Sequence, residues 1–318
     1  MKLTIKILKF KILHLKKALI IRLGQLGDVI LTTSVIEELY ERNYEIHYLT
    51  RKPFNEIFAD DFRVKKVFID KEVKLSELLK EKYSLILDLH FKFKTFLLSK
   101  IISPFHSKHY NKRILERRLT LIFKKNFNNK RIYEMYNETI NSNKKPKLIV
   151  KGEPIIEGDY IVINPTARYS SRIYRHYDKL DKLLENIPIK KVYIGTEKDL
   201  HFLKNYEFSG INLIGKTTIR EMLLIVKYAK LFVGNDSGIS HIASAFNIPS
   251  IVFFGPTVLS FGFEPFSDKY KVFQVNDLPC RPCSLHGEKP CKRNDYACLD
   301  WIEPEIVFEK ILEFLSLL

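Results

Sequence analysis

Near the start of the chain the carboxylate residue Asp28 follows two glycines, in the stretch IRLGQLGDVILTTSVIEELYERN of residues 21–43. An apolar run precedes Asp28, and apolar residues at helical spacing follow it. Asp28 is therefore predicted to lie at the junction between a strand and a helix. There a carboxylate can cap the free N–H groups of the helix, or it can take a proton from a substrate hydroxyl in a cleft. These residues alone leave both uses open.

A second stretch, VGNDSGISHIASAF at residues 233–246, has the composition of a phosphate-binding turn. Either Asp236 or Ser237 can cap the helix that follows. Gly238 permits a tight backbone, and His241 lies one turn further along the same face. The first turn of such a helix offers free N–H groups and the positive end of the helix dipole, which suit a phosphate. The alternative is an ordinary helix cap with a packed histidine.

Two loops add further polar groups after predicted strands. The loop NPTARYSSRIYRH at residues 164–176 contains the hydroxyl of Thr166 and the guanidinium of Arg172, which are good donors to a diphosphate. In GTEKD, at residues 195–199, Glu197 can accept hydrogen bonds from ribose hydroxyls. The alternatives are an ordinary basic loop and a glutamate that faces solvent.

The elements that must position these residues alternate between strand and helix. The predicted strands are residues 17–23, 45–50, 64–69, 83–90, 160–166, 190–196, 211–215, 230–236 and 250–257. The predicted helices are residues 28–42, 75–82, 218–229 and one that starts at Ser237. The charged, proline-containing segment of residues 143–158 is interpreted as a connector. The pattern therefore predicts an α/β fold of two doubly wound domains, with a cleft where the carboxyl ends of the strands face each other.

Length and composition agree with that prediction. The 318 residues suffice for two domains, and no apolar run is long enough for a membrane span. The first residues, MKLTIKILKFKILHLKK, contain six lysines that interrupt any apolar centre, unlike a signal peptide, so a cytoplasmic location is expected. The formal net charge of +16 indicates an anionic partner.

The excess charge is concentrated in one segment. Residues 108–131 contain nine Lys or Arg residues and a single acid, Glu116. This segment is either a solvated helical face or a surface for anionic lipid or an anionic acceptor. Nucleic acid is disfavoured as a partner because no known nucleic-acid motif is present.

Three stretches together resemble glycosyltransferase family 9, the heptosyltransferases of the lipopolysaccharide inner core. They are RLGQLGDVILTTSVIEEL, VGNDSGISHIASAFNIPSIVFFGPT and CRPCSLHGEKPCKRNDYACLDWIEPEIV, within residues 17–310. The resemblance implies the GT-B architecture of two Rossmann-like domains with an interdomain cleft. Residues 17–150 would bind the acceptor and residues 151–318 the nucleotide sugar, with a C-terminal helix packing back on the first domain. Residues 1–16 would be a basic extension.

The resemblance also implies an inverting reaction that requires no metal or other cofactor and uses an ADP-sugar, usually ADP-heptose, as donor. Asp28 matches the family's catalytic base. The positions that match donor-binding residues are Thr166, Arg172, Glu197, Asp236, Ser237, Gly238 and His241. Arg172 stands where the family has a lysine, and Ile-Tyr-Arg follows it in place of Arg-Trp-Pro.

An anionic, lipid-linked acceptor would meet basic and polar residues at the strand ends of the first domain. The expected acceptor residues are Arg22, Gln25, His90, Lys92 and Lys94. Kdo carboxylates and lipid A phosphates would account for their charge, and such an acceptor places the enzyme at the cytoplasmic face of the inner membrane as a peripheral protein. The segment DLHFKFK departs from the family's more usual Asp-x-Gln-Gly.

Four cysteines fall close together near the end of the chain. Cys280, Cys283, Cys291 and Cys298 have the spacing C-x2-C-x7-C-x6-C. Reduced or disulfide-linked structural cysteines, a structural zinc site and redox control are all compatible with this spacing.

Three functions remain open from the sequence. The first is an ADP-heptose-dependent heptosyltransferase. The second is another GT-B glycosyltransferase, or a nucleotide-sugar epimerase, with a different donor. The third is a non-catalytic protein that binds an anionic surface.

Overall fold

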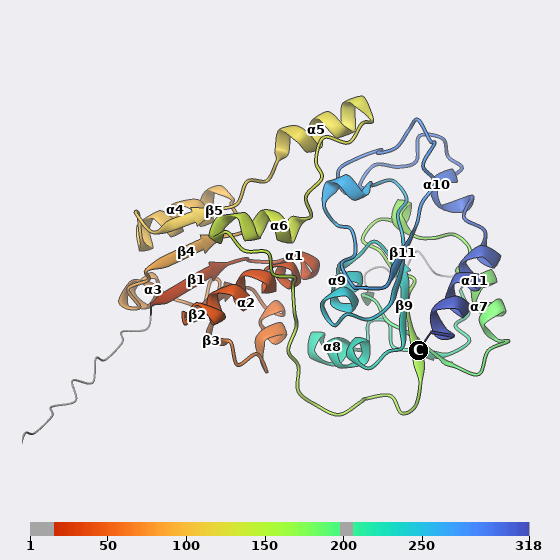
Figure 1. Cartoon of the computed structure of the whole chain (residues 1–318), viewed down its shortest axis with the longest axis horizontal. Coiled ribbons are helices and arrows are strands. Elements are labelled where there is room, and N and C mark those ends of the chain that lie inside the picture. The colour runs from red at the N-terminus through yellow and green to blue at the C-terminus, as the bar shows by residue number, and fades with distance from the viewer. Residues whose placement is uncertain (1–15, 198–205, 318) are drawn as a thin grey trace, which may run out of the picture.

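The computed structural model describes residues 16–197 and 206–317 (Figure 1). Nearly all of the predicted basic extension, residues 1–15, lies outside the described residues. Figure 1 shows the described chain as two α/β halves side by side. The predicted connector joins them without helix or strand.

The first half contains a five-stranded parallel sheet in the order β3-β2-β1-β4-β5. Its strands are β1 (Lys17–Ile21), β2 (Glu45–Thr50), β3 (Val64–Ile69), β4 (Leu85–Asp88) and β5 (Ser107–His109). Its helices are α1 (Leu26–Leu31), α2 (Thr33–Glu41), α3 (Leu75–Lys80), α4 (Phe93–Ile102), α5 (Ile114–Phe123) and α6 (Ile132–Asn137), with 3-10 turns η1 (Phe54–Phe58) and η2 (Glu138–Ile140). The central strand β1 is almost continuously apolar because both faces of a parallel sheet are covered.

The second half contains a six-stranded parallel sheet in the order β11-β10-β9-β6-β7-β8. Its strands are β6 (Tyr160–Asn164), β7 (Lys190–Tyr193), β8 (Ile211–Asn212), β9 (Leu231–Asn235), β10 (Ser250–Phe253) and β11 (Tyr270–Phe273). Its helices are α7 (Tyr177–Leu184), α8 (Ile219–Lys227), α9 (Gly238–Ala245), α10 (Ala297–Asp300) and α11 (Pro304–Leu315), with 3-10 turns η3 (Ser170–Arg172) and η5 (Leu259–Phe261).

The strand order reverses at one point in each sheet, and ligands of doubly wound folds bind beside such points. In the first sheet the reversal lies between β1 and β4, and in the second between β9 and β6. Asp28 follows β1 and His90 follows β4. Thr166 follows β6 and Asp236 follows β9. The topology thus brings the predicted residues of each half to its own reversal point.

Two element predictions differ from the structure. The helix predicted over residues 28–42 is two helices that meet at Thr32, whose hydroxyl donates back to the carbonyl of Val29 at 2.6 Å, a bond that competes with helix continuation. The C-terminal helix was expected on the first domain, but α11 packs on α7 and β9 (Figure 1). The reason is the stripe of Val307, Ile311 and Phe314, which belongs to the core of the second half.

The two halves share one hydrophobic cluster. Val29 and Ile30 of α1 belong to the same buried cluster as Ile242 and Ala243 of α9. The main α-helical contact between the halves is therefore α1 against α9, the two helices that begin at the predicted site.

Candidate functional site

Asp28 pairs with an arginine from the end of the preceding strand. Arg22 is buried, and its Nη1 donates to the carbonyl of Leu89 at 2.7 Å. Its Nη2 donates to Oδ2 of Asp28. Burial alone would lower the pKa of Arg22, but the charge of Asp28 raises it, so the guanidinium stays protonated. The structure gives Asp28 no capping bond: Gln25 is the N-cap residue of α1, and no side chain caps that helix.

The second polar turn is built around the start of α9. Ser237 is the N-cap residue, and its Oγ accepts from the backbone N–H of Ile239 at 3.3 Å. The same hydroxyl donates to Oδ1 of Asn164 at the end of β6, 2.8 Å away. Of the two capping alternatives, Ser237 is therefore the correct one. The start of α9 lies at the junction between the halves, because Gly238 packs against Gly27, and the first turn of a helix has N–H groups without partners inside the helix.

Asp236 is held by an ion pair within the second half. Nη2 of Arg172 lies 2.5 Å from Oδ2 of Asp236, and the hydroxyl of Thr257 donates to the same oxygen at 3.1 Å. The charge of Asp236, which would otherwise repel a diphosphate, is offset by this arginine. Arg172, predicted as a phosphate ligand, already has a carboxylate partner in the structure.

The N-terminal turns of α1 and α9 touch. A Cβ atom on Gly27 would lie 2.7 Å from Cδ2 of His241 and 3.3 Å from Cα of Gly238. A Cβ atom on Gly238 would lie 3.0 Å from the backbone nitrogen of Gly27. At Gly27 a side chain would force the His241 ring to shift, and at Gly238 it would meet the backbone of Gly27 at an unusually short distance, so glycine is favoured on each side. Asp28, next to Gly27, is thus brought to the Ser237–His241 turn.

His241 is buried at this contact. Its Nδ1 has no hydrogen-bond partner, and its ring lies against Phe266 and Phe263. Burial lowers the pKa of His241, although the charges of Asp236 and Asp28 act in the opposite direction. The imidazole is therefore neutral near pH 7, and its Nδ1 is buried without a hydrogen-bond partner.

The other two predicted donor residues lie at the strand ends of the second half. Thr166 is buried, and Oγ1 accepts from Nδ2 of Asn164 at 2.9 Å, which leaves its own proton free to donate elsewhere. Glu197 is exposed beyond β7, and a Cβ atom on Gly215 would lie 2.7 Å from its Cβ. Nothing in the structure fixes what its carboxylate binds, so its ribose role stays a prediction.

The predicted acceptor residues separate into four groups. Arg22 is used internally, as described, and serves to position Asp28. Gln25 is exposed and its Oε1 lies 3.5 Å from Nη1 of Arg168, across the junction. His90 is half-buried, and its Nδ1 has no partner. Lys92 and Lys94 are exposed, and Lys94 forms an ion pair with Asp70 at 3.2 Å.

Two residues at the junction were not predicted from the sequence. Arg117 of α5 stacks over the rings of Phe261 and Phe263 in the second half, and its Nε and Nη2 have no hydrogen-bond partner. Burial lowers its pKa, while the charge of Asp28 is among those that raise it. His286 lies in the cysteine-rich loop, and its pKa is lowered by burial and by the charges of Arg117 and Arg172. Arg117 was visible only as one member of the basic run, and His286 only as part of the loop.

The cysteine-rich loop supports Arg172. Nη1 of Arg172 donates to the carbonyl of His286 at 3.3 Å. Gly287 has φ +78°, and a Cβ there would lie 2.7 Å from Cδ of Arg172. The hydroxyl of Ser171 donates to the carbonyl of Gly287 at 2.5 Å. The loop thereby forms a wall of the donor side.

The four cysteines themselves are free thiols. In the described part of the chain no three of their sulfur atoms lie within 4.8 Å of one another, so the structure does not support the zinc alternative. Burial raises the pKa of Cys283 and, to about 12, that of Cys298. As free cysteines, those two thiols are therefore protonated at neutral pH.

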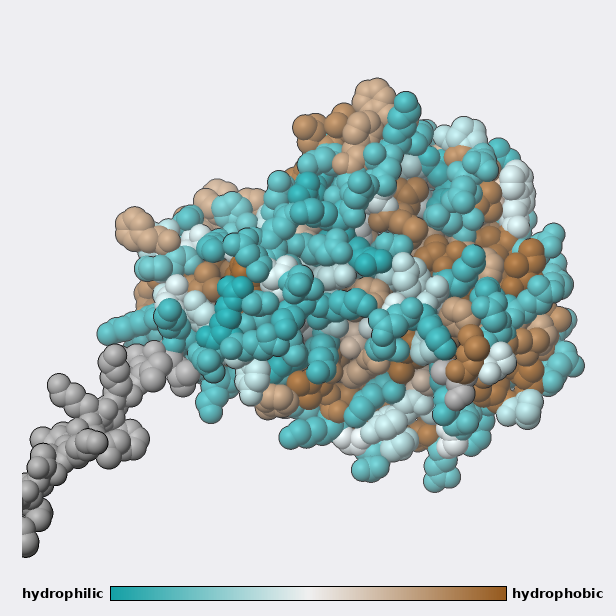
Figure 2. All heavy atoms as spheres, in the orientation of Figure 1, coloured by the Kyte–Doolittle hydropathy of each residue, from teal (hydrophilic) through white to brown (hydrophobic). Residues whose placement is uncertain are grey.

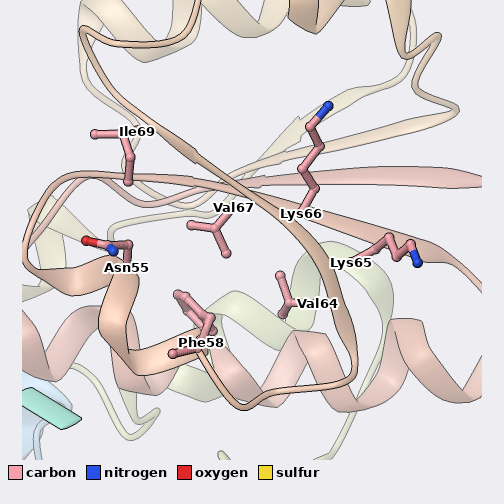
Figure 3. A pocket seen from close by; sticks show the side chains of 8 residues that line it. Asn55, Phe58, Val64, Lys65, Lys66, Val67 and Ile69 are labelled. Carbon is pink, nitrogen blue, oxygen red and sulfur yellow. The ribbon is translucent and has the colours of Figure 1, made fainter.

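Two other features do not coincide with the predicted site. Glu45, His47 and Glu81 lie close enough together to hold a metal ion, but the ammonium group of Lys17 is 2.5 Å from Glu81 and 3.3 Å from Glu45. A cavity of about 390 Å³ lies between η1 and β3. Figure 3 shows mainly apolar side chains around it, with Phe58 among them. Its lining contains no predicted site residue.

The paired parallel sheets define a GT-B fold, and comparison with solved structures agrees. Escherichia coli ADP-heptose lps heptosyltransferase II matches with a TM-score of 0.73 at 19% identity, over 94% of this chain and 98% of that chain. E. coli heptosyltransferase WaaC with ADP-2-deoxy-2-fluoro heptose matches with a TM-score of 0.61 at 17% identity, over 93% and 99% of the two chains.

The family follows from the sequence comparison. The model of glycosyltransferase family 9 (heptosyltransferase) matches residues 96–294. Lipopolysaccharide heptosyltransferase 1 of Campylobacter coli is 24% identical over an alignment 353 residues long, gaps included, and the alignment covers 93% of this chain and 98% of that relative. The chain belongs to glycosyltransferase family 9, and its predicted class, a glycosyltransferase, is confirmed.

Proposed function

We propose that this enzyme transfers a heptose from ADP-heptose to an inner-core acceptor of lipopolysaccharide, with inversion at the anomeric carbon. Family membership and the names of its relatives support the sugar and the pathway. The observation that carries the chemistry is the contact between the α1 and α9 turns. It places one carboxylate beside the helix end that suits a diphosphate.

The proposed reaction is a single displacement. Asp28 accepts the proton of the acceptor hydroxyl as that oxygen bonds to the anomeric carbon. The bond between this carbon and the diphosphate oxygen breaks, and ADP leaves with the electron pair. The N–H groups of the first turn of α9, together with Arg172, stabilise the charge that develops on the leaving group. Donors already in place can do so without a metal ion, which is the mechanism we propose.

We propose that the second half binds the donor and the first half binds the acceptor. On the donor side, the hydroxyl proton of Thr166 is free to donate, and Nδ1 of His241 has no hydrogen-bond partner. Glu197 is proposed to bind the ribose. On the acceptor side Gln25, His90 and Lys92 are proposed, with Arg117 added by the structure. Arg117 suits an anionic acceptor because its guanidinium is half-buried with open donors near Asp28.

Transfer is tested by following ADP release from ADP-heptose with a Kdo-bearing lipid A acceptor. Asp28→Asn should retain ADP binding and lose about 10²- to 10⁴-fold in turnover. Turnover close to that of the unchanged enzyme would remove Asp28 as the base. Arg63→Met, which breaks an ion pair with Asp61 remote from the junction, is a control for general destabilisation.

The donor is tested by thermal shift with ADP, UDP and a short oligonucleotide. A ligand at about 100 times its dissociation constant stabilises the folded state by about 2.7 kcal/mol. Stabilisation by ADP alone supports the proposed function. Stabilisation by UDP would favour a different GT-B donor, and stabilisation by the oligonucleotide alone would favour a non-catalytic binding protein.

The proposed acceptor is lipid-linked, so we also propose that the enzyme works at the inner-membrane surface. Among the described residues, no helix has both the length and the apolar character that crossing a bilayer requires. Contact with the membrane would then depend on a surface of the folded enzyme.

A further inference from the structure

Helix α4 exposes several large apolar side chains. Thr95 and Ser99 face the protein and are buried, whereas Phe93, Leu97 and Ile101 on the opposite side are exposed. The side chain of Phe93 is 83% exposed. The two buried hydroxyls donate to carbonyls of their own helix, so this inner face needs no polar partner in the sheet. Leu98 and Ile102 also pack inward on the core, but a water-facing helix normally keeps a polar outer side, and this one exposes several apolar side chains there.

Helix α5 repeats the arrangement beside the site. Its exposed arc carries Ile114, Leu115 and Ile122, and the last two are each 67% exposed. Its opposite arc carries Arg117, which lies at the junction, and the buried Thr120. The same helix therefore presents apolar side chains outward and a proposed acceptor residue inward. Leu115 and Ile122 are seven residues apart and so share one face of the helix, while Arg117 and Thr120, three residues apart, share another.

The segment that contains both helices is strongly basic. Residues 89–131 include 12 Lys or Arg residues and one acid, Glu116. Some of these cations are paired, such as Lys130 with Glu138. Arg118 and Lys125 are exposed beside the apolar arc of α5. An apolar face bordered by cations matches the surface of an anionic bilayer, where acyl chains lie beneath negative headgroups.

The two helices lie on one border of the molecule. Figure 1 shows α4 and α5 along the upper edge of the first half, with β5 between them. Figure 2, in the same orientation, shows brown and tan hydrophobic atoms along this edge. The loop between α4 and β5 adds Phe105, which is 92% exposed. Because α4 and α5 follow the carboxyl ends of β4 and β5, this border adjoins the edge of the sheet that holds Asp28.

We propose that the exposed faces of α4 and α5, with Phe105 between them, dock the enzyme on an anionic phospholipid surface. The inference rests on the proposed function, since a lipid-linked acceptor would lie in that surface. A second copy of the chain is a poorer partner, because two equally basic surfaces would repel each other. Docking through α5 brings the membrane next to Arg117 and so delivers a headgroup-borne sugar to the Asp28 side of the junction.

Vesicle flotation of the full chain tests the surface. One set of vesicles contains equal parts of phosphatidylglycerol and phosphatidylcholine, and the other contains phosphatidylcholine alone. The triple variant Phe93→Ser/Leu97→Ser/Ile101→Ser should bind the anionic vesicles at least about tenfold more weakly, because three side chains no longer enter the apolar layer. The variant Trp301→Ser/Ile306→Ser removes exposed apolar side chains from the second half and should bind unchanged.

A charge variant tests the electrostatic part. Arg118→Glu/Lys125→Glu should weaken binding to anionic vesicles by about fivefold or more for each cation lost. Both surface variants should unfold at the temperature of the unchanged enzyme, since their side chains are exposed. They should also keep full turnover on a delipidated acceptor, because none of the altered residues contacts the proposed reacting groups.

Three results would overturn the inference. One is unchanged binding of the triple variant to anionic vesicles, and another is equal binding of the unchanged enzyme to both kinds of vesicle. The third is a dimer in sedimentation that the triple variant abolishes, without vesicle binding, which would make this surface a protein interface. If the enzyme binds vesicles as expected but transfers no heptose to any acceptor, the proposed function fails while the docking surface stands.

Discussion

Removing the positive partner of Asp28 should reveal how the base is held. Arg22→Met leaves the carboxylate without its ion pair and also removes the bond to the carbonyl of Leu89. The side chains of Arg22 and Asp28 are 8% and 17% exposed, so the pair is largely shielded from water. Breaking a fully buried pair by removing one partner costs about 3–5 kcal/mol. Because Asp28 retains some contact with water, we expect about 2–3 kcal/mol, or roughly 5 °C in Tm.

The full set of variants separates stability from catalysis. Asp28→Asn leaves Arg22 buried without a counter-charge and should also be destabilised. In the double variant neither charge is left alone, so its loss of stability should be smaller than the two single losses combined. Its turnover should stay as low as that of Asp28→Asn, about 10²- to 10⁴-fold down. Arg22→Met keeps the carboxylate but not its orientation, and we expect a loss of about 10- to 100-fold in kcat.

The measurements are Tm by calorimetry and the rate of ADP release. The matched control is Arg63→Met, whose partner Asp61 lies 2.6 Å away and whose side chain is also buried, at 1% exposed. It should lower Tm without changing the kcat of the folded enzyme. Strictly additive losses of stability for Arg22→Met and Asp28→Asn would refute the pairing. A loss of kcat in Arg63→Met as large as that in Arg22→Met would refute its catalytic consequence.

Three further predictions follow from the same geometry. His241→Ala removes the ring at the α1–α9 contact and should weaken ADP binding in calorimetric titration; an unchanged affinity would place the nucleotide elsewhere. Gly287→Ala introduces a Cβ at φ +78° and 2.7 Å from Arg172, so it should raise KM for the ADP-sugar more than it lowers Tm, and equal KM would contradict the wall described here. Burial lowers the pKa of His90 from 6.5 to about 4, so between these values the unfolded chain binds more protons and stability falls as pH falls. His90→Gln should therefore lose less Tm than the unchanged enzyme between pH 6.5 and pH 4, and parallel curves would contradict this.

Strands beside the two reversal points could be predicted from the sequence because buried parallel strands leave a strong apolar signal. The predicted runs at residues 17–23 and 230–236 contain β1 and β9. Since both strands end in a glycine-containing turn, the pattern also indicated where Asp28 and Ser237 would lie. The pattern did not predict the direct contact between the two turns, because that contact depends on how the two halves pack.

The residues that the sequence misassigned or missed depend on contacts far along the chain. Arg22 was predicted to meet the acceptor because it follows a strand, yet the carbonyl of Leu89 and the Asp28 carboxylate enclose it. Arg117 was one of nine basic residues, and only the phase of α5 against Phe261 separates it from Arg118. Nothing local in the sequence distinguishes an inward arginine from an outward one when both are surrounded by apolar residues.

The ion pair of Arg172 gives a physical reason for an arginine where the family resemblance implies a lysine. One end of its planar fork binds Asp236 and the other binds the carbonyl of His286, while Nε has no partner. A lysine has a single charged nitrogen and could not hold the carboxylate and the cysteine-rich loop in this planar arrangement. A diphosphate that arrives at α9 would compete with Asp236 for the same guanidinium. The loop that carries Gly287 would be the first part of the structure affected by a movement of this guanidinium, because it is packed directly on the arginine side chain.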